Sequence, residues 1–401
     1  MSVADVESEL YYDPYDFAID DDPYPVWKRL RDEAPLYYNE RHDFYAISRY
    51  EDVDKALLDW DTYRSGKGTL LDVIKAGIEV PSGVILWEDP PIHDLHRSAL
   101  ARVFTPRRMA AVEERVRDYC RRCLDPLVGS DRFDFVADLG ASVPMRTIGF
   151  LLGIAEDDQA AVRGNVDEHI SLTDGGPGTY TQETVENAAG QIAEYVDWRY
   201  QHPSDDLMTE LINVEVEQVD GTRRRLSRDE VVMYTTMVAG AGNETATRLI
   251  AFAGERLANL PDQRRALADD FSLVPGAVEE SLRYDAPSPV QARVTTRPTE
   301  HHGHTVPEGA IMLILNGAAN RDERVFDDPD TFDIRRTANR HLSFGKGLHF
   351  CLGAALARLE GRVAIEEILT RWRDWEIDYD GAQMAHTSSV RGWASLPARL
   401  G

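Results

Sequence analysis

Cysteine, basic charge and long hydrophobic runs are all scarce in this sequence. Three cysteines among 401 residues cannot form a disulfide framework, which points to a reducing compartment. Lys and Arg total 44 against 70 Asp and Glu, a net charge of −26, which argues against a nucleic-acid binder. No stretch approaches the about 18 consecutive apolar residues of a membrane span, and the acidic N-terminus lacks the features of a secretory signal. We therefore expect a soluble cytoplasmic protein with no nucleic-acid partner and no membrane span.

The chain has an ordinary globular composition in which helical periodicity dominates. Apolar residues make up 43% and charged residues 28%, without repeats or a linker that separates two cores. We expect one domain over 1–401 that is mainly α with a small β region. Its β-containing N-terminal part covers about 36–49, and its helical core about 93–285. Apolar spacing predicts helices over 26–32, 50–58, 93–103, 107–127, 133–152, 157–172, 182–200, 227–259, 272–284 and 352–372, and strands over 292–295 and 310–315.

The strongest local signal is a glycine-rich run over 341–353, at the start of the last predicted helix. It reads His-Leu-Ser-Phe-Gly-Lys-Gly-Leu-His-Phe-Cys-Leu-Gly. The glycines let the backbone pass close to a flat or bulky group, and a helix N-terminus favours a thiolate at Cys351. A lone cysteine is more often a buried structural residue. The glycines, the helix start and Phe344 favour a functional cysteine here.

The long predicted helix contains an unusual segment over 238–247, with two glycines and the acid–alcohol pair Glu244–Thr245. Glycine in mid-helix costs about 1 kcal/mol relative to alanine. The Thr245 hydroxyl can bond to a carbonyl one turn earlier and open a groove for a ligand or water. A helix–helix crossing built on small residues explains the same segment equally well.

Several charged residues are candidates for binding an anion or for ion pairing. His93 and Arg97 lie one helical turn apart, although such a pair alone is more often a solvated basic stripe. Arg293 stands in an uncharged strand and needs an anionic partner. Glu280 and Arg283 have the i,i+3 spacing of a helical ion pair. The Cys-x-x-Cys at 120–123 has no second pair and lies in a helical pattern, which disfavours zinc and thioredoxin chemistry.

Taken in chain order, these motifs resemble those of a bacterial, class I type cytochrome P450, a haem-thiolate monooxygenase. The stretch 344–353 is similar to the family's haem-ligand loop, Phe-x-x-Gly-x-His-x-Cys-x-Gly. Residues 241–245 resemble the oxygen-activating groove, and 389–397 resemble the C-terminal turn. Glu280 and Arg283 match the E-x-x-R pair, with Arg336 as the expected third member. The chain departs from the family pattern at Ala246, where a second threonine is frequent, and at His349, where many members have arginine.

The resemblance implies a cytochrome P450 fold and haem b, iron protoporphyrin IX, as cofactor. Cys351 would be the proximal thiolate ligand, which favours O–O cleavage. Thr245 would hold oxygen and water, and Glu244 would relay protons. The haem propionates would contact four potential cations, namely His93, Arg97, Arg293 and His349. Ala241, Phe344 and Gly353 are further expected contacts of the cofactor. Glu280, Arg283 and Arg336 would form a buried structural network.

The resemblance also implies hydroxylation or epoxidation of an organic substrate with O₂. The substrate would lie under a roof made of the loop 65–86 and the segment 175–178. Small uncharged side chains favour an apolar compound, at Val238, Ala241, Val290, Ala292 and Val390. We expect a lipid, terpenoid or steroid-like molecule, with a polyketide or other secondary metabolite as the alternative.

Electrons are expected from a ferredoxin, because the chain has no flavin or iron–sulfur domain of its own. Basic residues on the proximal face are candidates for docking it, namely Arg102, Arg107, Arg108 and Lys346. A non-catalytic haem protein that only binds a ligand is the alternative from another class. The pair Glu244–Thr245 favours the enzyme, because a simple binder needs no proton relay.

Overall fold

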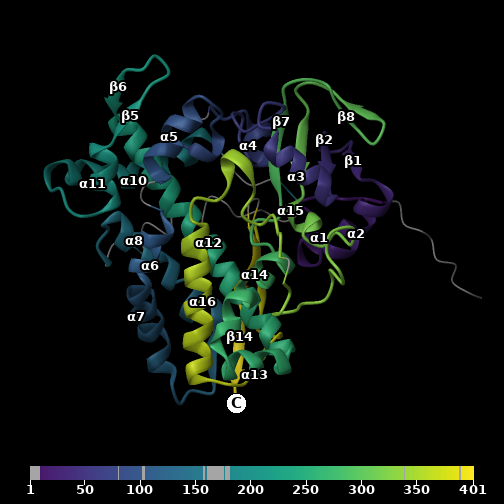
Figure 1. The fold of residues 1–401 in the computed structure, drawn as a ribbon, viewed down its shortest axis with the longest axis vertical. Helices are drawn as coiled ribbons and strands as arrows, with labels where there is room; N and C mark the ends of the chain where they lie inside the picture. Colours follow the sequence, from purple (N-terminus) through teal and green to yellow (C-terminus); the bar gives the residue numbers. More distant parts are fainter. Residues whose placement is uncertain are drawn as a thin grey trace, which may run out of the picture.

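The computed structural model describes residues 10–79, 81–101, 104–156, 159, 176, 181–337, 339–387 and 390–401. The helix predicted over 157–172 and the roof segment predicted at 175–178 fall outside this part of the chain, apart from Gln159 and Gly176. The prediction of a mainly α fold with a small β region is confirmed (Figure 1).

The longest helix, α12 (Arg228–Asn259), contains 32 residues and runs through the middle of the molecule (Figure 1). A capping box fixes its start: the Ser227 hydroxyl accepts the Glu230 N–H, and the Glu230 carboxylate accepts the Ser227 N–H. Nineteen of its residues are buried, on all sides of the helix. Such a helix is held by the elements around it rather than by its own propensity.

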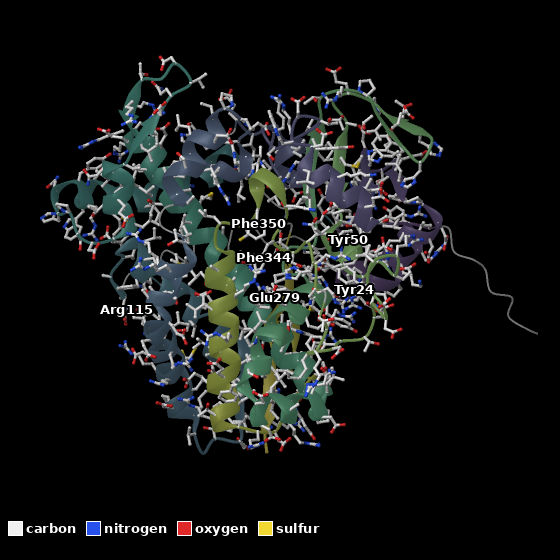
Figure 2. All side chains as sticks on the ribbon, in the orientation of Figure 1. Tyr24, Tyr50, Arg115, Glu279, Phe344 and Phe350 are labelled. Carbon is white, nitrogen blue, oxygen red and sulfur yellow. The ribbon has the colours of Figure 1, made fainter. Side chains whose placement is uncertain are left out.

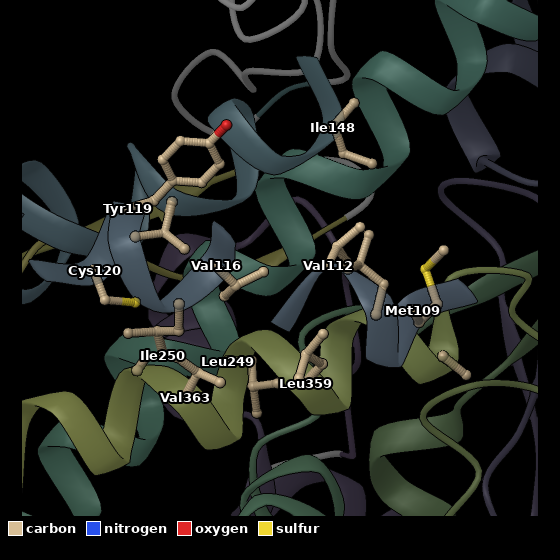
Figure 3. Close-up of a cluster of buried hydrophobic side chains, with 14 of the residues drawn as sticks. Met109, Val112, Val116, Tyr119, Cys120, Ile148, Leu249, Ile250, Leu359 and Val363 are labelled. Atoms are coloured by element: carbon tan, nitrogen blue, oxygen red, sulfur yellow. The ribbon is translucent and has the colours of Figure 1, made fainter. Parts of the chain in front are cut away.

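Two helices pack against α12, namely α8 (Val143–Leu152) and α16 (Ala354–Arg371), and α7 (Glu113–Leu124) packs against both of them. Their contact is apolar, as Figure 3 shows for Val116, Leu249, Ile250, Leu359 and Val363. The N-terminus of α16 therefore has a fixed position relative to the middle of α12.

The β region lies beside the helical part and contains a five-stranded sheet in the order β1-β2-β10-β7-β3 (Figure 1). β10 pairs in parallel with β2 and antiparallel with β7, and β1–β2 is the predicted N-terminal hairpin. The strand bounds are β1 Leu36–Asn39, β2 Phe44–Ile47, β3 Tyr63–Arg64, β7 Gln291–Thr295 and β10 Ile311–Ile314. The sheet places Arg293 on β7, at the edge of the helical part.

The remaining elements surround this frame. The further helices are α1 Phe17–Asp21, α2 Tyr24–Glu33, α3 Tyr50–Leu58, α4 Leu71–Ala76, α5 Ile92–Ala101, α6 Pro106–Ala111, α10 Gln182–Gln201, α11 Leu207–Asn213, α13 Pro261–Asp269, α14 Val274–Tyr284 and α15 Asn316–Ala319. The short helices are η1 Ile85–Trp87, η2 Asp125–Leu127, η3 Phe135–Gly140, η4 Phe271–Leu273 and η5 Gly347–His349. The other strands are β4 Arg132–Asp134, β5 Glu215–Glu217, β6 Arg223–Arg225, β8 Thr299–His301, β9 His304–Val306, β11 Trp375–Ile377, β12 Gln383–His386, β13 Arg391–Ser395 and β14 Pro397–Leu400.

Three predicted elements are wrong in detail. The expected loop after residue 65 contains the helices α4 and η1, of which Leu71 is buried in a cluster with residues of the sheet and Ile85 in a cluster with residues of α5. The helix predicted over 107–127 is broken at Val112 into α6 and α7. The helix predicted over 133–152 instead begins as strand β4, which pairs with β14, and continues as the π-helix η3 and then α8.

Among the described residues, Phe135–Leu152 is the one helical stretch long and apolar enough to cross a membrane. It comprises η3 and α8, and 61% of it is buried in the fold. Both elements pack against α12, so this apolar surface belongs to the core.

Candidate functional site

The cysteine loop is a tight structure at the N-terminus of α16. The Cys351 N–H donates to the Phe344 carbonyl at 2.8 Å, which closes the loop. Gly345 and Gly347 have φ values of 65° and 67°, a left-handed conformation that glycine adopts without strain. A side chain at Gly347 would also lie 2.9 Å from the Leu57 carbonyl. Backbone geometry therefore favours glycine at positions 345 and 347.

Burial raises the pKa of the Cys351 thiol, although the Gly353 N–H and the charge of Arg97 act to lower it. The thiolate expected at Cys351 from the helix N-terminus stays a prediction, since burial opposes the charge. A bound metal ion deprotonates a coordinating thiol outright. The sulfur is thus suited to a metal ligand and poorly suited to a free nucleophile.

A second set of contacts holds this loop on its neighbours. Arg358 on α16 donates to both Glu279 oxygens, at 2.6 and 3.0 Å, and its guanidinium lies 4.5 Å from the centre of the Phe344 ring. His341 contacts Glu279 at 3.2 Å. Burial acts to raise the pKa of Glu279, but these partners outweigh it and hold the pKa at about 2. Glu279, Phe344 and Phe350 lie close together beside the start of α16 (Figure 2).

Four predicted cations converge next to the cysteine loop. The rings of His93 and His349 lie 4.6 Å apart, and Arg97 donates to the carbonyl of Phe350 at 2.6 Å. Burial, followed by the charges of Arg293, His93 and Arg97, lowers the pKa of His349 to about 2. Burial also lowers the pKa of Arg293 to about 10, with Asp89 opposing it.

This cluster has too few anions for its positive charge. His93 Nδ1 contacts Asp94 at 3.1 Å, but the buried Nε2 on the other side of the ring has no hydrogen-bond partner. Arg293 is 6% exposed and donates to the carbonyl of Ala292 at 2.7 Å. Within the described residues, neither Arg97 nor Arg293 forms an ion pair. Buried cations require an anionic partner, so the cluster fits a ligand that carries carboxylates.

These observations fit haem. Its two propionates match a cation cluster with an orphaned imidazole nitrogen, and its iron matches a partly buried cysteine a few residues away. Ala241 in the middle of α12 is exposed, whereas most of the helix is buried.

The acid–alcohol pair has a different environment for each member. The Thr245 hydroxyl donates to the Ala241 carbonyl at 3.2 Å, one turn earlier, as the sequence predicts. Glu244 is buried and forms an ion pair of 2.5 Å with Arg248. Arg248 in turn donates to the Trp393 carbonyl on β13. Sequence reasoning missed Arg248, although its i,i+4 spacing from Glu244 was a usable signal.

The three residues predicted to form a structural network lie together. Glu280 and Arg283 are fully buried, and two guanidinium nitrogens of Arg283 donate to the two carboxylate oxygens, each at 2.8 Å. Arg336 donates from Nε to both Glu280 oxygens at 3.1 Å. The neighbouring Arg335 is exposed and does not contact Glu280 in the structure.

A cavity of about 60 Å³ brings three of the predicted pocket residues together, namely Val290, Ala292 and Val390. Its other wall comes from the N-terminal segment and α4, which sequence reasoning did not include: Tyr12, Tyr15, Ile19, Trp27 and Leu71. Val238 and Ala241 lie on α12 and do not line this cavity. The cavity is mostly apolar, with Asp72 and Arg391 among its polar residues.

The Cys-x-x-Cys segment forms no metal site in the part of the chain that the structure describes. Cys120 is buried in the apolar core of α7, and burial raises its pKa well above the usual value. Cys123 is free as well.

Comparison with known proteins gives one consistent family. The family model described as "Cytochrome P450" matches residues 178–385. "Putative cytochrome P450 123" of Mycobacterium bovis is 39% identical over 99% of this chain and 98% of its own length. The structure of cytochrome P450 CYP109Q5 from Chondromyces apiculatus has a TM-score of 0.85 and 30% identity, over 97% of this chain and 98% of the other. P450BioI, in complex with an acyl carrier protein ligated to hexadec-9Z-enoic acid, has a TM-score of 0.84 and 26% identity, over 96% of this chain and 100% of the other.

Proposed function

This chain belongs to the cytochrome P450 family and is a haem-dependent monooxygenase, and we propose that it hydroxylates or epoxidises an apolar organic substrate with electrons from a ferredoxin. In this proposal Cys351 is the ligand of the haem iron. The observation that carries it is the cluster of His93, Arg97, Arg293 and His349 beside Cys351, in which the buried His93 Nε2 has no hydrogen-bond partner among the described residues.

We propose that the protein's residues divide the work around the haem as follows. His93, Arg97, Arg293 and His349 would bind the propionates, with Arg97 and Arg293 supplying the permanent charge. The Gly353 N–H would hydrogen-bond the Cys351 sulfur and tune it. Ala241 and Phe344 would contact the cofactor. When bound, haem supplies the activation of O₂ for insertion of one oxygen atom into the substrate.

The acid–alcohol pair Glu244–Thr245 would deliver protons to the site. Thr245 would hold a water at its hydroxyl, since its bond to the Ala241 carbonyl fixes the direction of the oxygen lone pairs. Glu244 would pass protons from the buried side of α12 to that water.

The substrate proposal rests on the apolar side chains of Val290, Ala292 and Val390, which line one cavity. We favour a lipid, terpenoid or steroid-like compound, and the similarity to P450BioI, which is bound to a fatty-acyl carrier protein, supports the lipid. Val238 and Ala241 would complete the pocket next to the haem.

We further propose that the protein works as a single domain in the cytoplasm and receives electrons from an acidic ferredoxin. Phe350 is 41% exposed next to Cys351, and Arg107 is exposed on α6, which packs on α16. Lys346 is already paired with Asp54 at 2.5 Å, and Arg108 with Glu210, while Arg102 lies outside the described residues. Arg107 therefore becomes the main docking candidate of the four.

The test is a spectral screen for the shift that a substrate causes in the haem absorption, followed by product analysis. Fatty acids, steroids and terpenoids are compared with macrolides, and a plant-type ferredoxin with its reductase supplies electrons. We expect a shift and an oxygenated product with a member of the first group. Oxygenation confined to macrolides would establish the polyketide alternative, and a shift without product from any compound would indicate a haem protein that only binds. Reversal of charge at Arg107 should slow electron transfer and weaken its salt dependence.

A further inference from the structure

The ion pair between Glu244 and Arg248 joins the proposed proton relay to the C-terminal hairpin. Both side chains are buried, and Arg248 Nη2 lies 2.5 Å from Glu244 Oε2. A pair of this kind restrains its carboxylate strongly, because release leaves an uncompensated buried charge. The arginine therefore restrains the orientation of the Glu244 carboxylate.

The other side of the guanidinium holds β13. Arg248 Nη1 donates to the Trp393 carbonyl, and the aliphatic stem of Arg248 packs on Gly392. A Cβ at Gly392 would lie 2.8 Å from Arg248 Cδ, and Gly392 has a φ of 150°. Only glycine allows β13 to approach α12 this closely without strain.

The same segment forms part of the cavity wall. Val390 lines the cavity and stands two residues before Gly392. Contacts thus run without a break from the cavity through Gly392 and Trp393 to Arg248, and from there to Glu244, the neighbour of Thr245. Val390 thus stands three residues before the carbonyl that anchors Arg248.

We propose that Arg248 is a positioning residue that fixes the Glu244 carboxylate and couples it to the substrate wall through β13. Arg248 touches neither substrate nor cofactor. It keeps Glu244 ionised and turned toward the hairpin, and a shift of β13 changes that hold. This inference rests on the proposed role of Glu244, but the restraint itself can be tested separately.

The variants separate the effect of the positive charge of Arg248 from the effect of its hydrogen bonds to two partners. R248Q removes the charge and keeps a donor, whereas R248K keeps the charge but has a single ammonium for two partners. E244Q identifies the signals of Glu244. R371Q is the matched control, because Glu367–Arg371 is also an i,i+4 pair, of 2.7 Å, at the far end of α16.

The first measurement is an infrared pH titration of the holoenzymes, which follows the protonated-carboxyl band that E244Q removes. We expect this band to titrate at least about one pH unit higher in R248Q than in the wild type. R248K should titrate near the wild type, and R371Q should match it. An unchanged titration in R248Q would refute the proposal. If R248Q does not fold, the hairpin variant W393A replaces it, and a carboxyl titration in W393A that equals the wild type would refute the link to β13.

The second measurement is hydrogen exchange of the β13 amides in the same holoenzymes. R248Q and R248K should each exchange about tenfold faster at 391–395 than the wild type, whereas R371Q should not. Equal exchange in all four proteins would refute the coupling to the hairpin.

Turnover measurements then distinguish the relay role of Glu244 from the positioning role of Arg248. The pH dependence of O₂ reduction with a plant-type ferredoxin should shift in R248Q and disappear in E244Q, and the double variant should behave like E244Q. A normal profile in E244Q would contradict the relay role of Glu244 and leave the infrared result to decide on Arg248. A normal profile in R248Q alone, with E244Q impaired, would contradict only the role of Arg248.

Discussion

Replacing Glu280 by glutamine should strongly destabilise the fold, because this carboxylate compensates the fully buried Arg283 and the partly buried Arg336. It accepts bonds from Arg283 at 2.8 Å, from Arg336 at 3.1 Å and from the Asp333 N–H at 2.9 Å. Arg283 spends its other donors on the carbonyls of Asn320, Pro329 and Thr331, so it cannot turn away to water. Removing one partner of a buried pair costs about 3–5 kcal/mol.

The assay is chemical denaturation of the haem-free and haem-bound proteins, together with the haem content after expression. The control is E33Q, which breaks the exposed i,i+4 pair of Arg29 and Glu33, where no measurable change in the free energy of unfolding is expected. We expect E280Q to lose several-fold in haem content and E33Q to lose none. A loss below about 1 kcal/mol in E280Q with full haem content would refute the argument that this network is fully desolvated.

Three further predictions follow from single residues. T245A should bind haem and substrate but consume reductant with little product, and undiminished product yield per electron would contradict its role with the relay water. Burial raises the pKa of Glu360 to about 8, so its contribution to stability is present at acidic pH and lost as pH rises through 8. E360Q should therefore gain stability relative to the wild type between pH 6 and pH 9, and a constant difference in unfolding free energy would contradict this. Burial acts to lower the pKa of His96, but contacts with Glu230 and Glu88 raise it above the usual value, with Arg224 on the far side of Glu230. The charge-dependent part of the stability that H96Q loses should be fully present below pH 6.5 and should disappear as pH rises through the raised pKa. Denaturation curves of wild type and H96Q at pH 6 and pH 9 measure this difference. An equal difference in unfolding free energy at the two pH values would contradict a charged His96.

The sequence predicted those helices and strands whose ends are determined by residues close by in the chain. The predicted helix 227–259 corresponds closely to α12, because the Ser227–Glu230 capping box and the apolar pattern are both local. The π-helix η3 was not predictable in this way. Phe135 packs directly on Gly254 of α12, where a Cβ would lie 2.2 Å from the ring, so a distant contact determines its geometry.

The candidate site shows the same difference between local signals and contacts of distant residues. The glycine-rich loop and the cations carry their spacing in the sequence, and the structure brings them together. The cavity wall at Tyr12 and Trp27 is more than 250 residues from Val290, and no pattern within the chain connects them. Arg248 shares a helix with Glu244, but its second partner, the Trp393 carbonyl, is visible only after folding.

The central claim is that the sulfur of Cys351 binds the haem iron. The most direct test is the absorption spectrum of the reduced protein with carbon monoxide, recorded for the wild type and for C351S. We predict that the wild type shows the red-shifted Soret band of a thiolate ligand and that C351S lacks it. A wild-type band at the unshifted position, or a shifted band that survives in C351S, would contradict the account.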